Sequence, residues 1–343
     1  MNEKNDLVSI IITNWNGKRF LAGCIDSVLG QTYQKIEIIV VDCASNDGSL
    51  ELLKDRYGRE PRVKTISFKT DPGVSAACNI ACREHAKGEY VLLLNNDVVL
   101  PSDCIFKMLE GLGGDNETVV NPLQLNFKGQ FVPWTFHEPW ISPFLHKVRK
   151  IFLRHLQGNS VFYPSLACCL MKKQVLIDVP LNEHLFYQDV EWGWRLYLNK
   201  IRIKVLFDSY FFHADAGTVK GTEKQAYIYG VVAMATTYIC LSMSFFLLFL
   251  PVILSGYLVK FIRYLFSMQF KLASAYFRGF IQFFKDLRYF NIERRQVQSE
   301  RKIGDLEVIR FMLQSMAYSK ILEKKGRAFA ATHFIQRLPE GKP

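Results

Sequence analysis

The chain has 343 residues, of which 49% are hydrophobic and 22% are charged, with 21 glycines and 12 prolines. This composition excludes a disordered, a collagen-like and a low-complexity protein, and the length leaves room for a large buried core. The eight cysteines show no CxxC pair and no zinc-finger spacing, and no signal-peptide pattern precedes them. We therefore expect reduced thiols in a cytosolic compartment.

The net charge of +11 is concentrated near the C-terminus. Residues 260–343 contain 17 basic and 7 acidic side chains, whereas residues 1–259 are nearly neutral at +1. Immediately before the basic part, residues 225–259 carry no charged side chain at all. A basic tail alone is typical of nucleic-acid binding, but its position after a long apolar stretch favours a lipid surface and no nucleic-acid partner. The alternative is a buried helix pair followed by a solvated basic tail.

The first hundred residues alternate short apolar runs with helical patterns. Runs that are β-branched or leucine-rich and uncharged at their centres predict strands buried on both faces over 7–13, 36–42, 63–68 and 90–95. Apolar residues at helical spacing predict helices between them over 20–29, 49–57 and 74–86. The repeated alternation predicts an α/β fold with a mostly parallel sheet and helices on both faces.

Amides and carboxylates follow three of these strands. Ligands bind at the carboxyl ends of parallel strands, so we expect the binding site there. Neither GxGxxG nor GxxxxGK[ST] occurs in these turns, which disfavours a classical dinucleotide site and a P-loop. The polar residues are Thr13, Asn14 and Asn16 after the first strand, Asp42 and Asp47 after the second, and Asn95, Asn96 and Asp97 after the fourth.

The periodicity weakens over residues 102–159, where prolines lie among aromatic side chains such as Trp134 and Trp140. We expect loops and short elements there, which serve either as an acceptor-side wall or lid or as connecting structure. A compact apolar segment over 160–172, an acidic and aromatic cluster over 186–195 and a strand over 203–207 follow.

Carboxylates of that cluster and a late histidine complete the polar set. Asp189, Glu191 and His213 are expected to converge with the strand-end carboxylates on one edge of the sheet. Several carboxylates and one imidazole at one edge favour a divalent cation. For each Asp taken singly, helix capping is the alternative.

Five blocks of the sequence resemble the successive motifs of family 2 glycosyltransferases, which are inverting enzymes of the GT-A fold. The last block, together with the hydrophobic and basic tail, is most similar to bacterial rhamnosyltransferase-like members that build polysaccharides on polyprenyl diphosphate carriers. The blocks cover about residues 7–215 in the family's order and read VSIIITNWNG, IEIIVVDCASNDGS, DPGVSAACNIA, GEYVLLLNNDVVL and LNEHLFYQDVEWGWRL.

The resemblance implies donor-binding roles for the strand-end residues. Thr13, Asn14 and Asn16 would border the nucleotide, and Asp42 would accept a hydrogen bond from the pyrimidine imide. The residues that would enclose the ribose and diphosphate side are Asp47, Asp71, Gly73 and Asn79, and Asn96 is a further donor-binding residue.

The resemblance also implies a metal site. Residues 95–97, Asn-Asn-Asp, take the place of the family's DXD motif, with an amide at its first acidic position. An amide oxygen still ligates Mg²⁺ or Mn²⁺, and phosphate oxygens and water supply the remaining ligands. The implied metal set is Asp97, Asn95 and His213, and for the histidine the alternative is a packed core position.

The implied chemistry is one displacement at the anomeric carbon. The cation stabilises the leaving diphosphate while a carboxylate removes the proton of the attacking hydroxyl. Asp189 matches the family's base, but Gln188 stands where the family has Glu, so Glu191 remains an alternative. We expect Arg195 to pair with Glu191. The aromatic side chains of this cluster either stack on sugar rings or pack under a helix, and they are Tyr187, Trp192 and Trp194.

The uncharged stretch of 35 residues is longer than the roughly 20 that one transmembrane helix needs and too short for a comfortable pair. A single span would place the basic tail and the catalytic half on opposite sides of the bilayer, against the positive-inside rule. Breaks at Pro251, Ser255 and Gly256 favour a shallow re-entrant or in-plane hairpin. The basic, aromatic helix after it, with Lys271 and Lys285, is expected to lie on an anionic leaflet.

We therefore expect a GT-A catalytic domain over 1–220 and a hydrophobic and basic helical region over 221–343, associated with the cytoplasmic face of the cell membrane. The predicted activity is metal-dependent inverting transfer of a sugar, with rhamnose as first choice, from a UDP or dTDP donor to a hydroxyl of a lipid-linked saccharide. The alternatives are a polyprenyl-monophosphate glycosyltransferase, a nucleotidyltransferase and a non-catalytic membrane scaffold.

Overall fold

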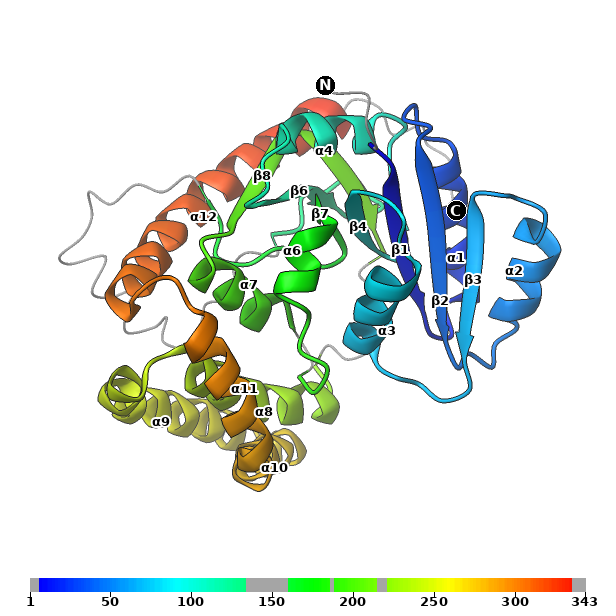
Figure 1. The fold of residues 1–343 in the computed structure, drawn as a ribbon. Helices are drawn as coiled ribbons and strands as arrows, with labels where there is room; N and C mark the ends of the chain where they lie inside the picture. Colours follow the sequence, from blue (N-terminus) through cyan, green and yellow to red (C-terminus); the bar gives the residue numbers. More distant parts are fainter. Residues whose placement is uncertain (1–5, 134–159, 186–187, 215–220, 335–343) are drawn as a thin grey trace.

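A computed structural model of the protein describes residues 6–133, 160–185, 188–214 and 221–334. These residues form an eight-stranded sheet in the order β3-β2-β1-β4-β7-β6-β8-β5, flanked by helices (Figure 1). The first four strands pair in parallel, as expected, and are β1 (Val8–Asn14), β2 (Ile36–Cys43), β3 (Val63–Phe68) and β4 (Tyr90–Asn95).

The other half of the sheet is mixed, because β7 runs antiparallel to both β4 and β6 while β6 runs parallel to β8. Four of the seven strand pairings are parallel, so parallel pairs form the majority, as expected, in a sheet that is mixed. The strands of this half are β5 (Val98–Val99), β6 (Thr118–Leu125), β7 (Cys168–Lys172) and β8 (Arg202–His213).

Helices cover both faces of the sheet, as predicted (Figure 1). Side chains alternate along a strand, so Ile10 and Ile12 join the core on one face and Ile11 joins the core on the other. The first face carries α1 (Lys18–Leu29), α2 (Ser49–Tyr57) and α4 (Cys104–Leu112). The second carries α3 (Val74–Ile80), the π-helical turn η1 (Ala81–His85), α6 (Lys173–Asp178) and α7 (Gln188–Leu198).

Residues 102–133 are more regular than the sequence pattern indicates, because they include α4 and the fully buried strand β6. Polar and proline residues interrupt the apolar pattern of this strand. The Asn121 NH₂ group donates to the carbonyls of Ser165 and Cys168, at 2.9 and 2.6 Å, while its buried Oδ1 has no partner among the described residues. Pro122 stands where the pairing with β8 shifts register, a position at which a strand tolerates a missing N–H.

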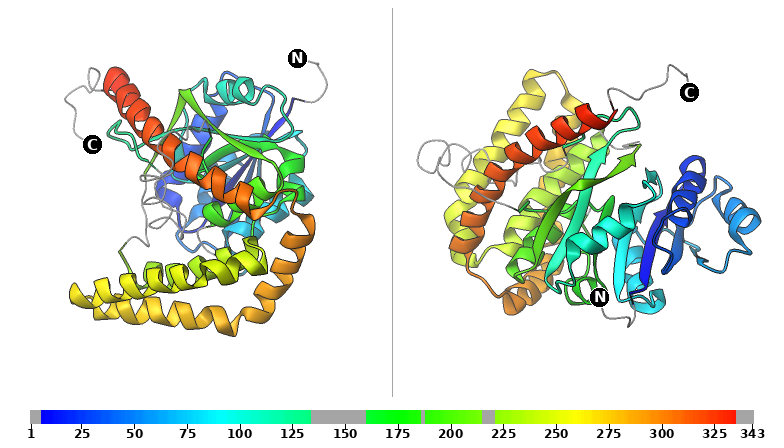
Figure 2. Two further views of the ribbon diagram at one scale, coloured as in Figure 1. Left: turned by 90° about the vertical axis from the view of Figure 1, so that its left-hand side faces the viewer. Right: turned by 90° about the horizontal axis from the view of Figure 1, so that it is seen from above.

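Five helices follow the sheet. Figure 2 shows the first three in one layer, from which α11 leads away to α12, which contacts β8. Helices α8 and α10 cross at Gly230 and Gly279, where a Cβ atom on either residue would collide with the backbone of the other helix. The helices are α8 (Glu223–Cys240), α9 (Met243–Phe266), α10 (Phe270–Lys285), α11 (Leu287–Glu300) and α12 (Asp305–Phe334).

The uncharged stretch breaks earlier than expected. Helix α8 ends at Cys240, and Ser242 caps α9, which then continues through Pro251, Ser255 and Gly256. Because α8 is largely buried, it belongs to the hydrophobic core that extends from the sheet. The predicted break at residues 251–256 is therefore wrong, and the two helices of the stretch lie in different surroundings.

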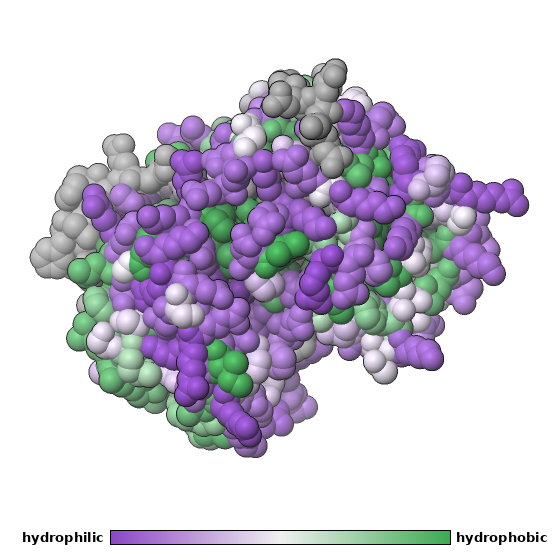
Figure 3. All heavy atoms as spheres, viewed as in Figure 1, coloured by the Kyte–Doolittle hydropathy of each residue, from purple (hydrophilic) through white to green (hydrophobic). Residues whose placement is uncertain are grey.

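Helix α9 is the apolar and exposed part of this stretch. Its length of 24 residues and the mean hydropathy of 2.2 in its most apolar window are sufficient to cross a membrane, and only 17% of that window is buried. In Figure 3 hydrophobic side chains gather along the lower left margin, where Figure 1 shows α9. The large apolar side chains of α9 that are more than half exposed are Leu247, Leu248, Leu258, Val259 and Phe266.

Candidate functional site

The carboxyl ends of β1, β2 and β4 meet in a network of amides. The Asn14 side chain donates to Asp42 Oδ2 at 2.9 Å and to Ser45 Oγ at 3.1 Å, and its own oxygen accepts from Asn96 Nδ2 at 2.7 Å. Asn96 lies so close to Gly17 that a Cβ atom there would overlap its amide. The structure thus brings together residues from three predicted turns.

Asp42 is the buried carboxylate of this network. Its carboxylate is fully buried, and its second oxygen accepts the backbone N–H of Ser45 at 2.9 Å. In this arrangement Asp42 orients Asn14 and the loop after β2 and is closed to solvent. Direct contact with a nucleotide base would require the loop to open.

Asn16 and Ser45 join the two loops at the surface. The Asn16 backbone, at φ +49°, donates to Ser45 Oγ at 2.9 Å, while its side-chain oxygen accepts the N–H of Asn46 at 2.8 Å. Thr13 is half-buried at the end of β1. Ser45 was not among the expected site residues, and the run of small polar residues after β2 is the sequence signal that could have indicated it.

Asp47 and Asp71 organise the starts of helices. Asp47 accepts hydrogen bonds from the Lys18 N–H at 2.8 Å and from Ser49 at 2.5 and 3.1 Å. Burial raises the pKa of Asp47, but the bonds from Ser49 and Lys18 outweigh it and leave the pKa below its ordinary value. Asp71 accepts the N–H of Gly73, the residue directly before α3, which has a φ of +81°. Both carboxylates therefore stabilise the loops that lead into α2 and α3.

The expected metal residues do converge. Antiparallel pairing of β5 with β8 brings His213 Nε2 to 3.0 Å from Asp97 Oδ1 and 3.5 Å from the Asn95 amide nitrogen. The other ring nitrogen, Nδ1, lies 2.9 Å from Nε2 of Gln124 on β6. Gln124 was not predicted from the sequence, because only the pairing of β6 with β8 brings it there.

These side chains suit a hard divalent cation. Carboxylate and amide oxygens with one imidazole nitrogen match the ligand preferences of Mg²⁺ and Mn²⁺. Gln124 contacts the second ring nitrogen and orients the imidazole; for Nε2 to bind a metal, the Gln124 amide has to turn so that its oxygen accepts the N–H of Nδ1. Across the described residues, no three His, Cys, Asp or Glu side chains gather closely enough to hold a metal ion. The set fits a cation whose remaining ligands are phosphate oxygens and water.

Asp189 and Glu191 share the first turn of α7 but differ in access. Glu191 is fully buried and receives two hydrogen bonds from Arg195, at 2.6 and 2.9 Å, so the expected pair is present. Asp189 is half-buried, and in the described part of the chain no side chain pairs with it. Burial raises the pKa of Asp189 to about 6. Because Glu191 has no access to an acceptor, it is corrected from a candidate base to a structural partner.

Asn79 is the expected donor residue that the structure places elsewhere. It is buried on α3, and its amide bonds the segment before α7: Nδ2 donates to Leu181 O at 2.8 Å and to Glu183 Oε1 at 3.0 Å. Its oxygen accepts the Leu181 N–H at 3.0 Å. With its hydrogen-bonding groups used in this way, Asn79 does not enclose the donor as the resemblance implies.

The segment from Val179 to His184 is held from three sides. From α7, Trp192 and Arg195 donate to the carbonyls of Val179 and Pro180, both at 2.7 Å. The bond of Trp192 to Val179 and its full burial place this side chain in the core, where it cannot stack on a sugar. Trp194 is fully buried as well. Tyr187 and the aromatic residues over 134–159 lie outside the described residues.

The third side of this segment is α11. Tyr289 donates to the Asn182 side-chain oxygen at 3.2 Å, and the Asn182 amide donates to Glu293 at 3.2 Å. The Tyr289 ring stacks on His184 with centroids 3.9 Å apart. The helical region therefore contacts the segment that leads to Asp189, which the sequence pattern does not show.

Comparisons with known proteins identify the family. Residues 9–179 match the family model described as glycosyl transferase family 2. The glycosyltransferase GlyG of Streptococcus pneumoniae is 25% identical over 226 residues, which cover 64% of this chain and 74% of GlyG. The chondroitin synthase of Pasteurella multocida is 36% identical over 99 residues, but these cover 29% of this chain and 10% of that protein.

Solved structures show the same fold along nearly the whole chain. S. aureus TarS 1-349 in complex with UDP-GlcNAc gives a TM-score of 0.55 at 16% identity and 98% coverage of both chains. The mannosyltransferase PcManGT from Pyrobaculum calidifontis in complex with GDP-Man and Mn²⁺ gives 0.51 at 13% identity, over 94% of this chain and 91% of that one. With a GT-A fold and a matching catalytic segment, the chain belongs to the family 2 glycosyltransferases.

Proposed function

We propose that this protein is an inverting glycosyltransferase that moves a sugar from a nucleoside diphosphate to a hydroxyl group, with help from a divalent cation. The observation that carries the proposal is the convergence of Asn95, Asp97 and His213 beside the amide network of the strand ends. That edge offers both a cation site and a donor site, as expected for a sheet whose ligands lie at the carboxyl ends of its strands. The related folds bound to UDP-GlcNAc and to GDP-Man with Mn²⁺ support it.

The donor would lie against the loops after β1, β2 and β4. Thr13, Asn14, Asn16 and Asn96 would contact it, and Asp42 would act by orienting Asn14. Asp47, Asp71 and Gly73 would shape the surrounding loops, because their bonds stabilise the starts of α2 and α3. Ser45, which bonds both Asn14 and Asn16, is added to this set.

Asp97, Asn95 and His213 would hold the cation, with Gln124 orienting the imidazole. A cation bound there would stabilise the negative charge of the leaving diphosphate as a Lewis acid. The chain's own task is to keep these side chains in place, and the β5–β8 pairing does so.

Asp189 would be the general base. In the same step as the attack on the anomeric carbon, one of its carboxylate oxygens accepts the proton of the acceptor hydroxyl. A pKa of about 6 makes this carboxylate a stronger base than an ordinary Asp while it stays mainly ionised near neutral pH. Because no described side chain pairs with it, its oxygens remain available to an acceptor.

We further propose that the acceptor is a lipid-linked saccharide at the cytoplasmic face of the membrane, in cell-surface polysaccharide synthesis. The exposed apolar face of α9 and the charge of +10 over residues 260–343 support this assignment. The chondroitin synthase among the relatives is named for a polysaccharide, which agrees with this assignment. For the donor sugar, rhamnose from dTDP remains the first hypothesis, with UDP sugars next.

A thermal-shift panel tests the proposal. The full chain in detergent is heated with UDP, dTDP, GDP and CDP sugars, each with and without Mn²⁺, because a ligand that binds only the folded state raises the melting temperature. We expect a Mn²⁺-dependent rise with one sugar nucleotide and metal-dependent hydrolysis of that donor. A folded sample without any shift would favour the non-catalytic scaffold. Retained turnover in Asp189→Asn would favour a polyprenyl-monophosphate acceptor, which needs no base.

A further inference from the structure

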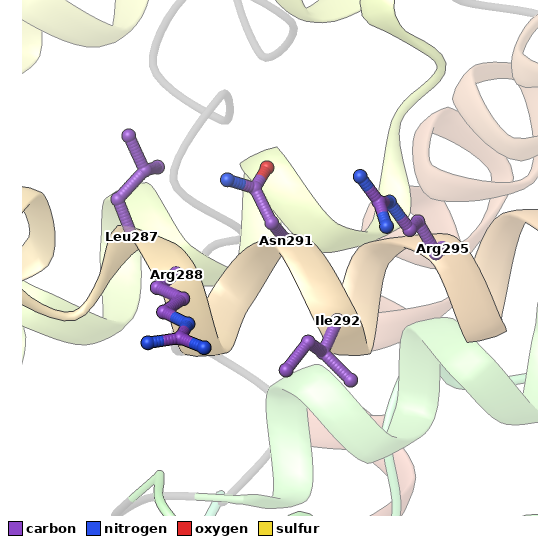
Figure 4. Close-up of a pocket in the computed structure, with 5 residues that line it drawn as sticks. All are labelled: Leu287, Arg288, Asn291, Ile292 and Arg295. Atoms are coloured by element: carbon purple, nitrogen blue, oxygen red, sulfur yellow. The ribbon is translucent and has the colours of Figure 1, made fainter.

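Helix α11 carries an open groove of about 510 Å³ that the proposed catalytic site does not use. Its described lining consists of Leu287, Arg288, Asn291, Ile292 and Arg295. Figure 4 shows Leu287, Asn291 and Arg295 along one edge of the helix, with Arg288 and Ile292 along the other. Tyr289 and Glu293, which contact Asn182 and His184, are not among these residues, so the groove and those contacts lie on different faces of α11.

The charged side chains of the groove are the two arginines, Arg288 and Arg295. Neither forms a hydrogen bond or an ion pair with any described residue, and both are exposed. One helical turn from Arg288 and Arg295 there is no carboxylate in the sequence in either direction. By contrast, Arg301 pairs with Asp305 at 3.0 Å, and Arg327 pairs with Glu323 at 2.8 Å.

Asn291 adds a third donor between the arginines. Its Oδ1 accepts the hydroxyl of Tyr238 at 2.5 Å, which leaves its NH₂ group without a partner among the described residues. The polar side chains of the groove thus present N–H donors, and the two arginines give them a total charge of +2. Guanidinium groups flanking a neutral donor suit the oxygens of a phosphate group.

Exposed apolar side chains lie in the groove and just before it in the chain. Ile292, in the groove itself, is 59% exposed, and Phe284, three residues before Leu287 in the chain, is 51% exposed. Figure 2 shows α10 in the same layer as α9, with α11 rising directly from its end. Free guanidinium groups next to exposed apolar side chains are expected where a protein surface meets the headgroup level of a bilayer.

We propose that the α11 groove binds the phosphate group of a lipid headgroup at the membrane surface. The proposal rests on the membrane association proposed above and adds a defined site to it. Arg288 and Arg295 would contact the phosphate oxygens, Asn291 would donate between them, and Ile292 would lie against the lipid. Such a site would fix the depth and orientation of α11, and through the contacts on its other face the segment that leads to Asp189.

Vesicle flotation of the full chain tests the site. Vesicles of phosphatidylcholine carry either phosphatidic acid, whose phosphate is terminal, or phosphatidylglycerol, at matched surface charge. We expect tighter binding to phosphatidic acid, and we expect the double variant Arg288→Gln/Arg295→Gln to lose this preference and to bind about thirty-fold more weakly, since each basic residue contributes about five-fold near an anionic surface. The control Arg59→Gln/Arg310→Gln removes two exposed arginines elsewhere and should keep the preference.

Three results would overturn the proposal. Equal losses of vesicle binding in the two double variants would show that general electrostatic attraction, and not a defined site, explains the binding. The absence of any preference for phosphatidic acid in the wild-type protein would remove the phosphate site. Stabilisation by inorganic phosphate through Arg288 and Arg295, without vesicle binding, would assign the groove to free phosphate instead. Metal-dependent donor hydrolysis on the same samples reports on the catalytic proposal, so that a failure of one is distinguished from a failure of the other.

Discussion

Asn79 and Leu181 lie 102 positions apart and are joined by a pair of hydrogen bonds, in which one side-chain amide satisfies both backbone groups of one residue at 2.8 and 3.0 Å. The pair ties α3, which begins on the donor side of the sheet, to the segment before α7. Since Asp189 follows that segment by only a few residues, the position of the proposed base depends on a residue of the donor half.

Replacement of Asn79 by Ala should therefore lower kcat and leave donor affinity unchanged. It leaves two buried backbone groups unpaired, which costs about 1–3 kcal/mol of stability each, and it frees the segment before Asp189. Steady-state kinetics should show kcat reduced at least ten-fold with the donor KM within two-fold. Asn199→Ala, which removes a single bond to a carbonyl at the end of α7, is the matched control. A raised donor KM with normal kcat would return Asn79 to the donor site.

The parallel half of the fold follows from local patterns, and so do the residues at its strand ends. A strand buried on both faces has to be apolar along its length, and the polar residues then mark where it ends. The site partners that were missed depend on contacts that no local pattern contains. Gln124 reaches His213 across 89 positions, and Glu293 reaches Asn182 across 111.

Two features of the structure differ from the sequence predictions for a similar reason. Strand β6 was missed because Asn121 and Pro122 interrupt its apolar run, although a buried partner and a register shift accommodate them. For the base, the spacing of the sequence does not distinguish Glu191 from Asp189. Only the three-dimensional structure shows that Arg195 occupies both of its oxygens.

The rate of transfer should depend on one ionisation near pH 6. Asp189 has to be deprotonated to accept the acceptor's proton, and burial raises its pKa to about 6. With donor and acceptor saturating, kcat should rise with pH through about 6 and then level off, falling about ten-fold for each pH unit below the midpoint. Asp189→Asn should lose activity at all pH values and still show the donor-dependent thermal shift. A profile that is flat from pH 5 to 8 would assign the base elsewhere.

The same substitution should stabilise the fold at neutral pH. The folded protein holds the Asp189 proton more tightly than the unfolded chain, so this group favours folding at low pH, and the benefit disappears as pH rises through about 6. Asp189→Asn is neutral at every pH and should melt a few degrees higher than the wild type at pH 8. The difference should shrink toward pH 4. A lower melting temperature at pH 8 would show that the carboxylate makes a favourable contact.

Changes at the cation site should separate metal dependence from folding. Asp97→Ala and His213→Ala should each abolish the Mn²⁺-dependent part of the donor-induced thermal shift. Gln124→Ala should weaken the apparent Mn²⁺ affinity about 10- to 100-fold, because its contact orients the imidazole. Mn²⁺ titration of donor hydrolysis measures this affinity. Unchanged Mn²⁺ affinity in all three variants would exclude this set of side chains as the cation site.

The buried pair of Glu191 and Arg195 should contribute to stability and not to proton transfer. Glu191→Gln removes one partner of a fully buried ion pair and leaves the Arg195 charge uncompensated, at a cost of about 3–5 kcal/mol. Urea denaturation should show this loss, whereas the pH midpoint of kcat in the remaining folded enzyme should stay near that of the wild type. The exposed pair Asp26–Arg56 is the control, and Asp26→Asn should cost less than about 1 kcal/mol because solvent screens that pair. A shifted pH midpoint in Glu191→Gln, with little loss of stability, would make Glu191 a participant in the chemistry.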